Sequence, residues 1–311
     1  MKISLYPPLS IHEIGQRPNQ EDSIAQWDNR LFVLCDGMGG HEKGEVASQT
    51  VCQSLVKWFG ENIKDDPFTD AQLCDSLEYA YTELDKYDDG SPRKMGTTLT
   101  LLYIHNKGVT AAHIGDSRIY HIRNDQGVGI FYVSRDHSLA FDLFQSGEIT
   151  YGEMQNFPQK NIVTRAITPG KDNRVRPDVI HITNIKRGDW FVLCSDGIME
   201  NFNIPSFCQS LRSHFPHETD EEICQRLISA TSKNQDNHSA WLIHVEYAIP
   251  DEGDEMLPDE EPIARCNALN IIRQRREEDN DDVVIVQQVA KTKSLLQRMK
   301  EVVDVIMNKK N

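Results

Sequence analysis

The chain has 311 residues and a formal net charge of −15 at pH 7, from 48 acidic and 33 basic side chains, which argues against a general nucleic-acid-binding protein because phosphate backbones require a basic face. Its 39% hydrophobic and 26% charged residues are ordinary for a globular protein. No run approaches the roughly 20 apolar residues that span a bilayer, and no secretory signal begins the chain, so we expect a cytoplasmic protein without membrane contact.

The first half of the chain alternates between patterns typical of strands and of helices. Apolar residues recur at helical spacing in two stretches, and short apolar runs bounded by turn residues predict strands. The predicted helices span 44–63 and 73–84, and the predicted strands lie in 1–14, 31–35, 97–104 and 109–114.

The second half continues with the same kinds of element. Strands are predicted at 119–122, 130–133, 175–182, 190–194 and 240–245, and helices within 139–160 and at 221–230. Strands therefore occur in two groups with helices outside them. This order predicts two packed sheets flanked by helices.

The C-terminal part differs in composition. Residues 250–262 are acidic and contain prolines, which is typical of a linker, and 263–277 and 289–308 have helical patterns. We therefore predict a main folded domain at 1–249, an acidic linker at 250–262 and a helical extension at 263–311. The apolar stripe of the last helix could dock or self-associate, or the extension could fold back onto its own domain.

Seven cysteines are scattered along the chain without a Cys-x-x-Cys pair, which indicates reduced thiols rather than a zinc site. Two buried strands, in contrast, each end in an acid. The run from Leu31 to Cys35 leads into Asp36 and Gly37, and the run from Trp190 to Cys194 leads into Ser195 and Asp196. A single Asp-Gly step is commonly just a turn, but the repeated arrangement predicts a shared acidic site.

More acids lie at predicted strand ends and turns. They are Glu21, Asp22, Asp116, Asp136 and Asp236. Each alone could be a turn or cap residue. Together, and without a matching set of histidines and cysteines, they predict all-oxygen ligation, which suits Mg²⁺ or Mn²⁺ rather than zinc.

These acids lie in short motifs that occur in a familiar order. With them the chain resembles the metal-dependent serine/threonine protein phosphatases of the PPM class, the protein phosphatase 2C family, in its bacterial form. The matching stretches are Gly15 to Asp22, Cys35 to His41 with Gly44 and Glu45, Gly96 to Thr98, Gly115 to Arg118, Asp136 to Ser138, Thr164 to Ile167, Ser195 to Gly197, and Asp236 with Asn237.

The resemblance implies an α/β/β/α sandwich of two mainly antiparallel sheets with a binuclear Mn²⁺ or Mg²⁺ centre, at which a metal-bound water hydrolyses phosphoserine and phosphothreonine in proteins. By position, Asp36 would bridge both ions and Gly37 would offer its carbonyl oxygen. Asp196 and Asp236 would complete the first metal, and Glu21 would serve the second. Asp116, together with Asp196, would hold a third, weaker ion. Asp22 would orient water. Arg17 would bind the phosphate.

General chemistry is consistent with these roles. Two cations about 3.5–4 Å apart can bind the attacking oxygen and polarise the phosphoryl group in one in-line displacement. Arginine matches the bidentate geometry of phosphate better than lysine does. The sequence departs from animal members at Met38, where a histidine is expected, so the general acid is unassigned; His41 and His137 are candidates, although a structural histidine is the more common case.

Several alternatives remain open at this stage. Asp279 could replace Asp236 as the last ligand, but Asp236 precedes the strand that completes the core. Residues 139–161 match the flap of the family, or form a simple surface insertion. A phosphoprotein-binding pseudophosphatase is the alternative function, and a two-metal nuclease is disfavoured by the negative charge. The expected partners are phosphorylated substrates of a Ser/Thr kinase.

Overall fold

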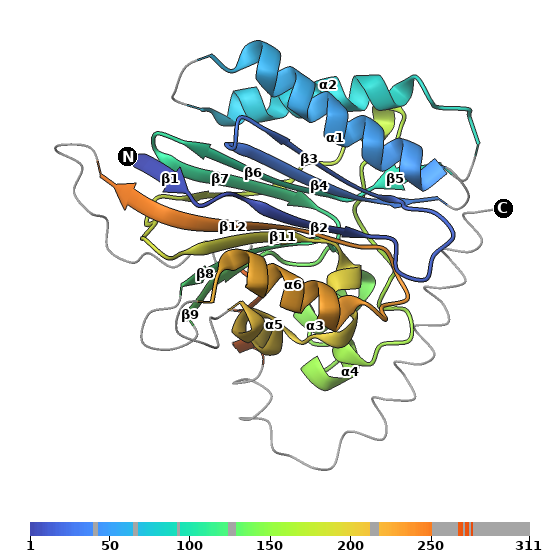
Figure 1. The fold of residues 1–311 in the computed structure, drawn as a ribbon. Helices are drawn as coiled ribbons and strands as arrows, with labels where there is room; N and C mark the ends of the chain where they lie inside the picture. The colour runs from blue at the N-terminus through green and yellow to red at the C-terminus, as the bar shows by residue number, and fades with distance from the viewer. Residues whose placement is uncertain are drawn as a thin grey trace.

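Two six-stranded sheets pack against each other between two layers of helices (Figure 1). The computed structural model describes residues 1–39, 43–64, 68–91, 94–123, 129–211, 218–250, 267–269, 271–273 and 275. Neighbouring strands in both sheets pair antiparallel in the described part of the chain. The predicted α/β/β/α sandwich is confirmed.

The first sheet has the strand order β1-β12-β11-β8-β9, with β2 also paired to β12. Its strands are β1 (Lys2–Leu5), β2 (Leu9–Glu13), β8 (Arg118–Arg123), β9 (Gly129–Val133), β11 (Trp190–Cys194) and β12 (His238–Ile249). The long β12 is therefore the strand that joins the N-terminal strands to the middle of the chain.

The second sheet has the order β10-β7-β6-β4-β3, with the short β5 paired to β4. Its strands are β3 (Asp22–Trp27), β4 (Leu31–Met38), β5 (Gly96–Thr97), β6 (Leu99–His105), β7 (Gly108–Ile114) and β10 (Asp178–Ile182). The predicted hairpin of the 97–114 region is present as β6 and β7.

The helices lie on the two outer faces (Figure 1). Helices α1 (Lys43–Asn62) and α2 (Asp70–Asp85) cover the second sheet, whereas the other helices lie on the side of the first sheet. The latter are α3 (Leu139–Gln145), α4 (Tyr151–Gln155), α5 (Ile204–Ser210) and α6 (Asp220–Thr231), and the 3₁₀ turns are η1 (Lys171–Asn173) and η2 (Asp196–Asn201). Helix α5 was not predicted, because its seven residues are too few for a helical period to stand out.

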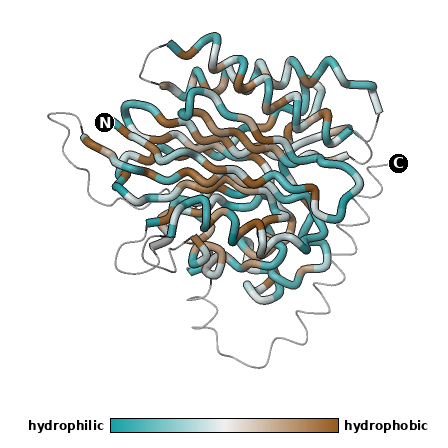
Figure 2. The backbone as a smooth tube through the Cα atoms, in the orientation of Figure 1, coloured by the Kyte–Doolittle hydropathy of each residue, from teal (hydrophilic) through white to brown (hydrophobic). Residues whose placement is uncertain are grey.

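The apolar run of β4 is explained by burial on both faces. Side chains alternate along a strand, so Phe32 and Leu34 pack between the sheets, while Leu31, Val33 and Cys35 pack under α1 and α2. Strand β11 divides its residues in the same way between the two sheets and the other helical layer. Figure 2 shows the hydrophobic residues concentrated along the strands between the helical layers.

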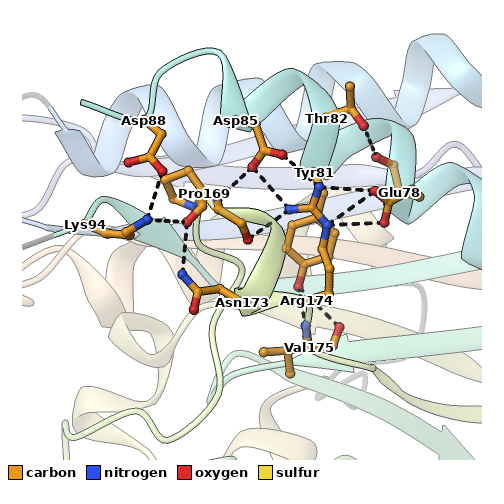
Figure 3. A network of polar contacts seen from close by, with 11 residues as sticks. Glu78, Tyr81, Thr82, Asp85, Asp88, Lys94, Pro169, Asn173, Arg174 and Val175 are labelled. Carbon is orange, nitrogen blue, oxygen red and sulfur yellow. Dashed lines mark hydrogen bonds and ion pairs between the residues drawn. The ribbon is translucent and has the colours of Figure 1, made fainter. Parts of the chain in front are cut away.

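A polar network fastens the loop before β10 to helix α2 (Figure 3). The guanidinium of Arg174 pairs with Asp85 at 2.8 Å and Glu78 at 3.1 Å, and lies over the ring of Tyr81 at 4.5 Å. The hydroxyl of Tyr81 donates to the carbonyl of Val175 at 3.2 Å and accepts from its N–H at 2.9 Å. This loop follows the Thr164 to Ile167 motif, in which Ile167 forms an antiparallel bridge with Thr97 of β5.

Part of the C-terminal extension is described and packs on the first domain. Residues 268–269, 271–273 and 275 are helical, and Ala268, Ile271 and Ile272 belong to the same core cluster as Phe141 of α3. The predicted linker 250–262, the predicted helix 289–308, His41 and Asp279 are not within the described residues, apart from residue 250. Among the described helices, none combines the length and apolar composition that crossing a bilayer requires.

Candidate metal centre

Asp22 and Asp36 lie directly opposite each other on the antiparallel strands β3 and β4. Directly opposed residues have Cβ atoms only about 4.5–5.5 Å apart, and like charges in such a pair destabilise the sheet. Asp22 is buried, with 3% of its surface exposed. Two carboxylates in this arrangement need positive charge near them.

Gly37 follows Asp36 where the chain passes very close to other backbone. A Cβ atom at Gly37 would lie 2.2 Å from the carbonyl oxygen of Gly44 and 2.7 Å from that of Glu21. The N–H of Gly37 donates to the Glu21 carbonyl at 3.0 Å. A residue with a side chain would separate these segments, so glycine is what allows Glu21 to lie beside the end of β4.

The motif Gly96 to Thr98 holds the backbone of Asp36. The N–H of Asp36 donates to the Thr98 hydroxyl at 2.9 Å, and its carbonyl accepts from the Thr98 N–H at 2.8 Å and the Thr97 hydroxyl at 2.9 Å. The Thr98 hydroxyl also contacts the hydroxyl of Ser117 at 2.8 Å. The turn that carries Asp116 is thus tied to the end of β4.

Asp196 comes from the other sheet, at the start of η2 directly after β11. Its neighbour Ser195 joins the sheets, because the Ser195 hydroxyl donates to the Asp22 carboxylate at 2.8 Å. The same hydroxyl accepts the N–H of Ser239 at 2.9 Å. The duplicated strand-plus-acid pattern therefore meets at one end of the sandwich, one copy from each sheet.

Asp236 lies two residues before the start of β12, and Arg17 donates a hydrogen bond to its carboxylate at 2.8 Å. The loop that carries Arg17 is held by Asn237, whose side chain accepts from the Glu21 N–H and donates to the carbonyls of Ile14 and Asn19. These three distances are 2.8, 2.8 and 3.0 Å. The loop that carries Arg17 and the start of β12 are therefore bound together at the end of the sandwich where the acids lie.

The acids influence each other's protonation. Burial, followed by the charges of Asp22, Asp196 and Asp116, raises the pKa of Asp36 well above its usual range. Burial and the charge of Asp196 have the same effect on the pKa of Asp116. For Asp196, burial and the charge of Asp236 raise the pKa to about 6.

Asp22 and Glu21 show the same direction. Burial raises the pKa of Asp22 to about 7, although hydrogen bonds from Ser239 and Ser195 act in the opposite direction. Burial also raises the pKa of Glu21, against the charge of Arg17. The cluster is therefore unfavourable as a set of bare anions. Its carboxylate and carbonyl oxygens are the donors that Mg²⁺ and Mn²⁺ prefer, so the residues present fit divalent cations.

Three of the candidate ligands border an open cleft. Asp116, Asp196, Asp236 and Arg17 line a cavity of about 500 Å³, which is also lined by residues of α3, α4 and the C-terminal extension. Asp136 also borders it, but both of its oxygens accept from Arg118, at 2.7 and 2.6 Å. A ligand entering this cleft would meet the acidic end directly.

Comparison with known proteins identifies the family. The family model described as protein phosphatase 2C matches residues 11–231. The chain belongs to the protein phosphatase 2C family. It is therefore an enzyme of the metal-dependent PPM phosphatase class, as the order of its motifs predicted.

Bacterial protein phosphatases are among the relatives of this chain. It is 34% identical over 205 residues to protein phosphatase PhpP of Streptococcus pneumoniae, a match that covers 64% of this chain and 79% of the relative. It is 31% identical over 200 residues to serine/threonine protein phosphatase PstP of Mycobacterium tuberculosis, covering 63% of this chain and 37% of that protein.

Solved structures share the fold. Serine/threonine phosphatase Stp1 from Staphylococcus aureus superposes with a TM-score of 0.67 at 29% identity, over 79% of this chain and 98% of that one. The catalytic domain of PstP in complex with two manganese ions has a TM-score of 0.64 at 27% identity, over 78% of this chain and 98% of that one.

A second group of possible metal ligands in the phosphatase is better explained as structural. Ligand atoms of His113, His137 and Asp178 lie within 4.8 Å of one another. However, the two rings are stacked with an interplanar angle of 16°, so their in-plane lone pairs do not converge on one ion. The ring of His137 accepts from the Gly115 N–H through Nδ1, at 3.1 Å, and its Nε2 lies 3.2 Å from Asp178.

His137 therefore buttresses the turn before Asp116 and is fully enclosed, which does not suit a general acid. Several supporting residues had no individual role in the sequence analysis. Ser195, Asn237, Thr98 and Asp178 all act through long-range hydrogen bonds, and only their presence inside the matching motifs, or next to them, could have pointed to three of them. Asp178 carried no sequence signal.

Proposed function

We propose that this serine/threonine protein phosphatase hydrolyses phosphoserine and phosphothreonine in proteins at a centre of two divalent cations, Mn²⁺ or Mg²⁺. Asp36 would be the ligand shared by both ions and Gly37 would offer its carbonyl oxygen, Asp196 and Asp236 would hold the first ion, and Glu21 would serve the second. Asp116, together with Asp196, would hold a third and weaker ion. When bound, such cations supply Lewis acidity to the phosphoryl group and lower the pKa of bound water.

The remaining residues act on the substrate and on water. Arg17 binds the phosphate through its planar guanidinium, which presents paired donors to two phosphate oxygens. Asp22, which lies opposite Asp36 on the paired strands β3 and β4, would orient the attacking water. No side-chain nucleophile is required.

The observation that carries this proposal is the convergence of buried and half-buried acids from two sheets, which raise one another's pKa values and of which Asp116, Asp196 and Asp236 line a cleft that also contains Arg17. Clusters of this kind mark functional sites because structural stability alone does not favour them. The manganese complex of the PstP catalytic domain supports the choice of cation for this fold.

The test replaces the shared ligand. Asp36→Asn keeps the size of the side chain but removes its charge. We expect kcat for p-nitrophenyl phosphate with Mn²⁺ to fall at least about 100-fold, and Mn²⁺ affinity measured by calorimetry to fall as well. Asp172→Asn makes the same change at an exposed position in η1 and should leave both values near those of the wild type.

Two outcomes would refute the proposal. If Asp36→Asn is as active as the wild type, Asp36 is not the shared ligand. If the wild type binds phosphoproteins but releases no phosphate with Mn²⁺, the alternative of a pseudophosphatase is correct. Domain limits of 1–249, 250–262 and 263–311, and opposition to a Ser/Thr kinase, are part of the same proposal.

A further inference from the structure

The described part of the C-terminal extension is built into the wall of the cleft. Asn267 forms an antiparallel bridge with Ser134, and its side chain donates to the Phe131 carbonyl at 3.2 Å. Arg275 donates to the carbonyl of Gln145, the last residue of α3, at 2.7 Å. These contacts attach the segment at two points, one beside β9 and one at the end of α3.

Between these points the segment presents apolar side chains to the domain. Ile271 and Ile272 are 7% and 6% exposed, and both belong to the core cluster of α3. Only one of the two, however, borders the cleft: Ile272 lines it and Ile271 does not. The neighbouring Ala268 lines it too.

The lining of the cleft is therefore of two chemical kinds. Arg17 and the acids supply one part, and apolar side chains from α3 and α4, the region of η2 and the extension supply an apolar wall; the lining also includes the charged residues Lys160 and Glu200. The apolar residues of this wall include Phe141, Met154, Met199, Phe202, Ala268 and Ile272. A cavity of about 500 Å³ is more than a phosphorylated side chain fills and is in the range of pockets for larger ligands.

We propose that this apolar wall binds a large apolar side chain of the phosphoprotein substrate, two positions from the phosphorylated residue, and that Ile272 and Ala268 make the extension part of the substrate site. This inference rests on the proposed function. In an extended peptide, alternate residues point to the same side at about 7 Å spacing. A residue two positions away therefore enters the same cleft as the phosphorylated residue, which lies at the acidic end.

The occupant is a substrate segment because the wall is continuous with the acidic end within one cavity. An apolar side chain there removes its own surface and that of the wall from water, which favours binding. Substrates with a polar residue at both of these positions leave the wall exposed. The wall thus selects among phosphoproteins, while the acidic end acts on the phosphoryl group common to all.

The first experiment compares phosphothreonine peptides that differ only at the positions two before and two after the phosphothreonine, with Leu or Ser at each. Phosphate release by the full-length chain with Mn²⁺ should give a kcat/KM about tenfold higher for at least one Leu peptide than for the Ser peptide. Equal kcat/KM values for all peptides would overturn the inference. p-Nitrophenyl phosphate is assayed in parallel, and absence of its hydrolysis would instead refute the proposed function.

The second experiment uses two adjacent isoleucines as a matched pair. Ile272→Ala and Ile271→Ala delete the same atoms from residues of similar burial, so their effects on folding should be comparable. The ratio of kcat/KM for Leu over Ser peptides should fall to about a third or less in Ile272→Ala and stay at the wild-type value in Ile271→Ala. An equal ratio in both variants would contradict a role for Ile272.

A variant outside the extension tests the apolar wall without changing the extension itself. Met154 is partly buried on α4 and lines the same cleft. Met154→Ala should lower the same ratio while thermal denaturation stays cooperative. If Met154→Ala leaves the ratio unchanged, the apolar wall does not bind the apolar side chain of the substrate.

Discussion

Asp22 and Asp36 illustrate how one arrangement of residues creates both a cost and a function. Opposed across β3 and β4, their charges repel each other when both are ionised. A divalent cation reverses that effect, because the charge of the ion dominates the local electrostatics. The residues of the acidic cluster should therefore report on cation binding through stability as well as through activity.

This leads to a pH dependence with a definite sign. Folded-state pKa values of about 7 for Asp22 and about 6 for Asp196 lie above the unfolded values near 3.9, so the folded state binds more protons between these limits. Stability then falls as pH rises through the folded pKa values. Without metal, we therefore expect the free energy of unfolding to fall by roughly 1 kcal/mol or more from pH 5 to pH 8.

Urea denaturation in a chelator at several pH values measures this drop, and addition of Mn²⁺ at pH 8 should restore stability. Asp22→Asn removes one of the two titrating groups and should flatten the profile. A metal-free protein that is more stable at pH 8 than at pH 5 would contradict the electrostatic account.

Arg17 differs from the acids because its side chain is 55% exposed, although its guanidinium also pairs with Asp236. Arg17→Ala should reduce kcat/KM for phosphopeptides about 10- to 100-fold, the value of one or two hydrogen bonds to a charged group. Arg17→Lys keeps the charge but loses the planar fork, so its kcat/KM should lie between those of Arg17→Ala and the wild type. Arg187→Ala, at an exposed site before β11, is the control.

At the level of elements, Asn237 is the clearest case of a residue that positions others. Its side chain is buried and ties the loop 14–21 to the start of β12. Glu21 and Arg17 lie on that loop, and Asp236 precedes Asn237. The geometry of three proposed functional residues thus depends on one amide side chain.

Asn237→Ala should lower the free energy of unfolding by about 1–3 kcal/mol, since it leaves buried backbone groups unsatisfied. It should also weaken Mn²⁺ binding about 10- to 100-fold, as loss of supporting hydrogen bonds does at metal sites. Chemical denaturation and calorimetric titration measure the two effects. Asn156→Ala, on the exposed end of α4, should change neither.

For the whole molecule, the described extension residues continue the core between the first sheet and the helices that cover it, α3 among them. Ile271 and Ile272 pack with α3, and each buried isoleucine contributes about 1.5–3 kcal/mol relative to exposure. A chain ending at residue 250 should therefore melt several degrees lower, at about 2–4 °C per kcal/mol for a protein of this size, and be less soluble. An unchanged melting temperature would favour the alternative in which the extension docks elsewhere.

Much of this architecture could be predicted from local patterns. Some features are properties of neighbouring residues and can be recognised from the sequence alone. They are the apolar run and terminal acid of β4, their repetition at β11, and the helical spacing of α1, α2 and α6. Helix α5 was missed for the opposite reason, because seven residues hold too little periodicity. The set of acids was found because each lies at a strand end or in a turn within a recognisable short motif.

Other features depend on segments that are far apart in the chain. The pairing of Asp22 with Asp36, the bond from Ser195 to Asp22, and the grip of Asn237 on residues 14–21 exist only once the sheets are formed. The same holds for Ile272, whose position in the cleft wall follows from packing against α3. Amino-acid order sets secondary structure and the kinds of side chain at each strand end through short-range sterics and periodicity. The meeting of those side chains in one site depends on long-range strand pairing and burial, which no local pattern encodes.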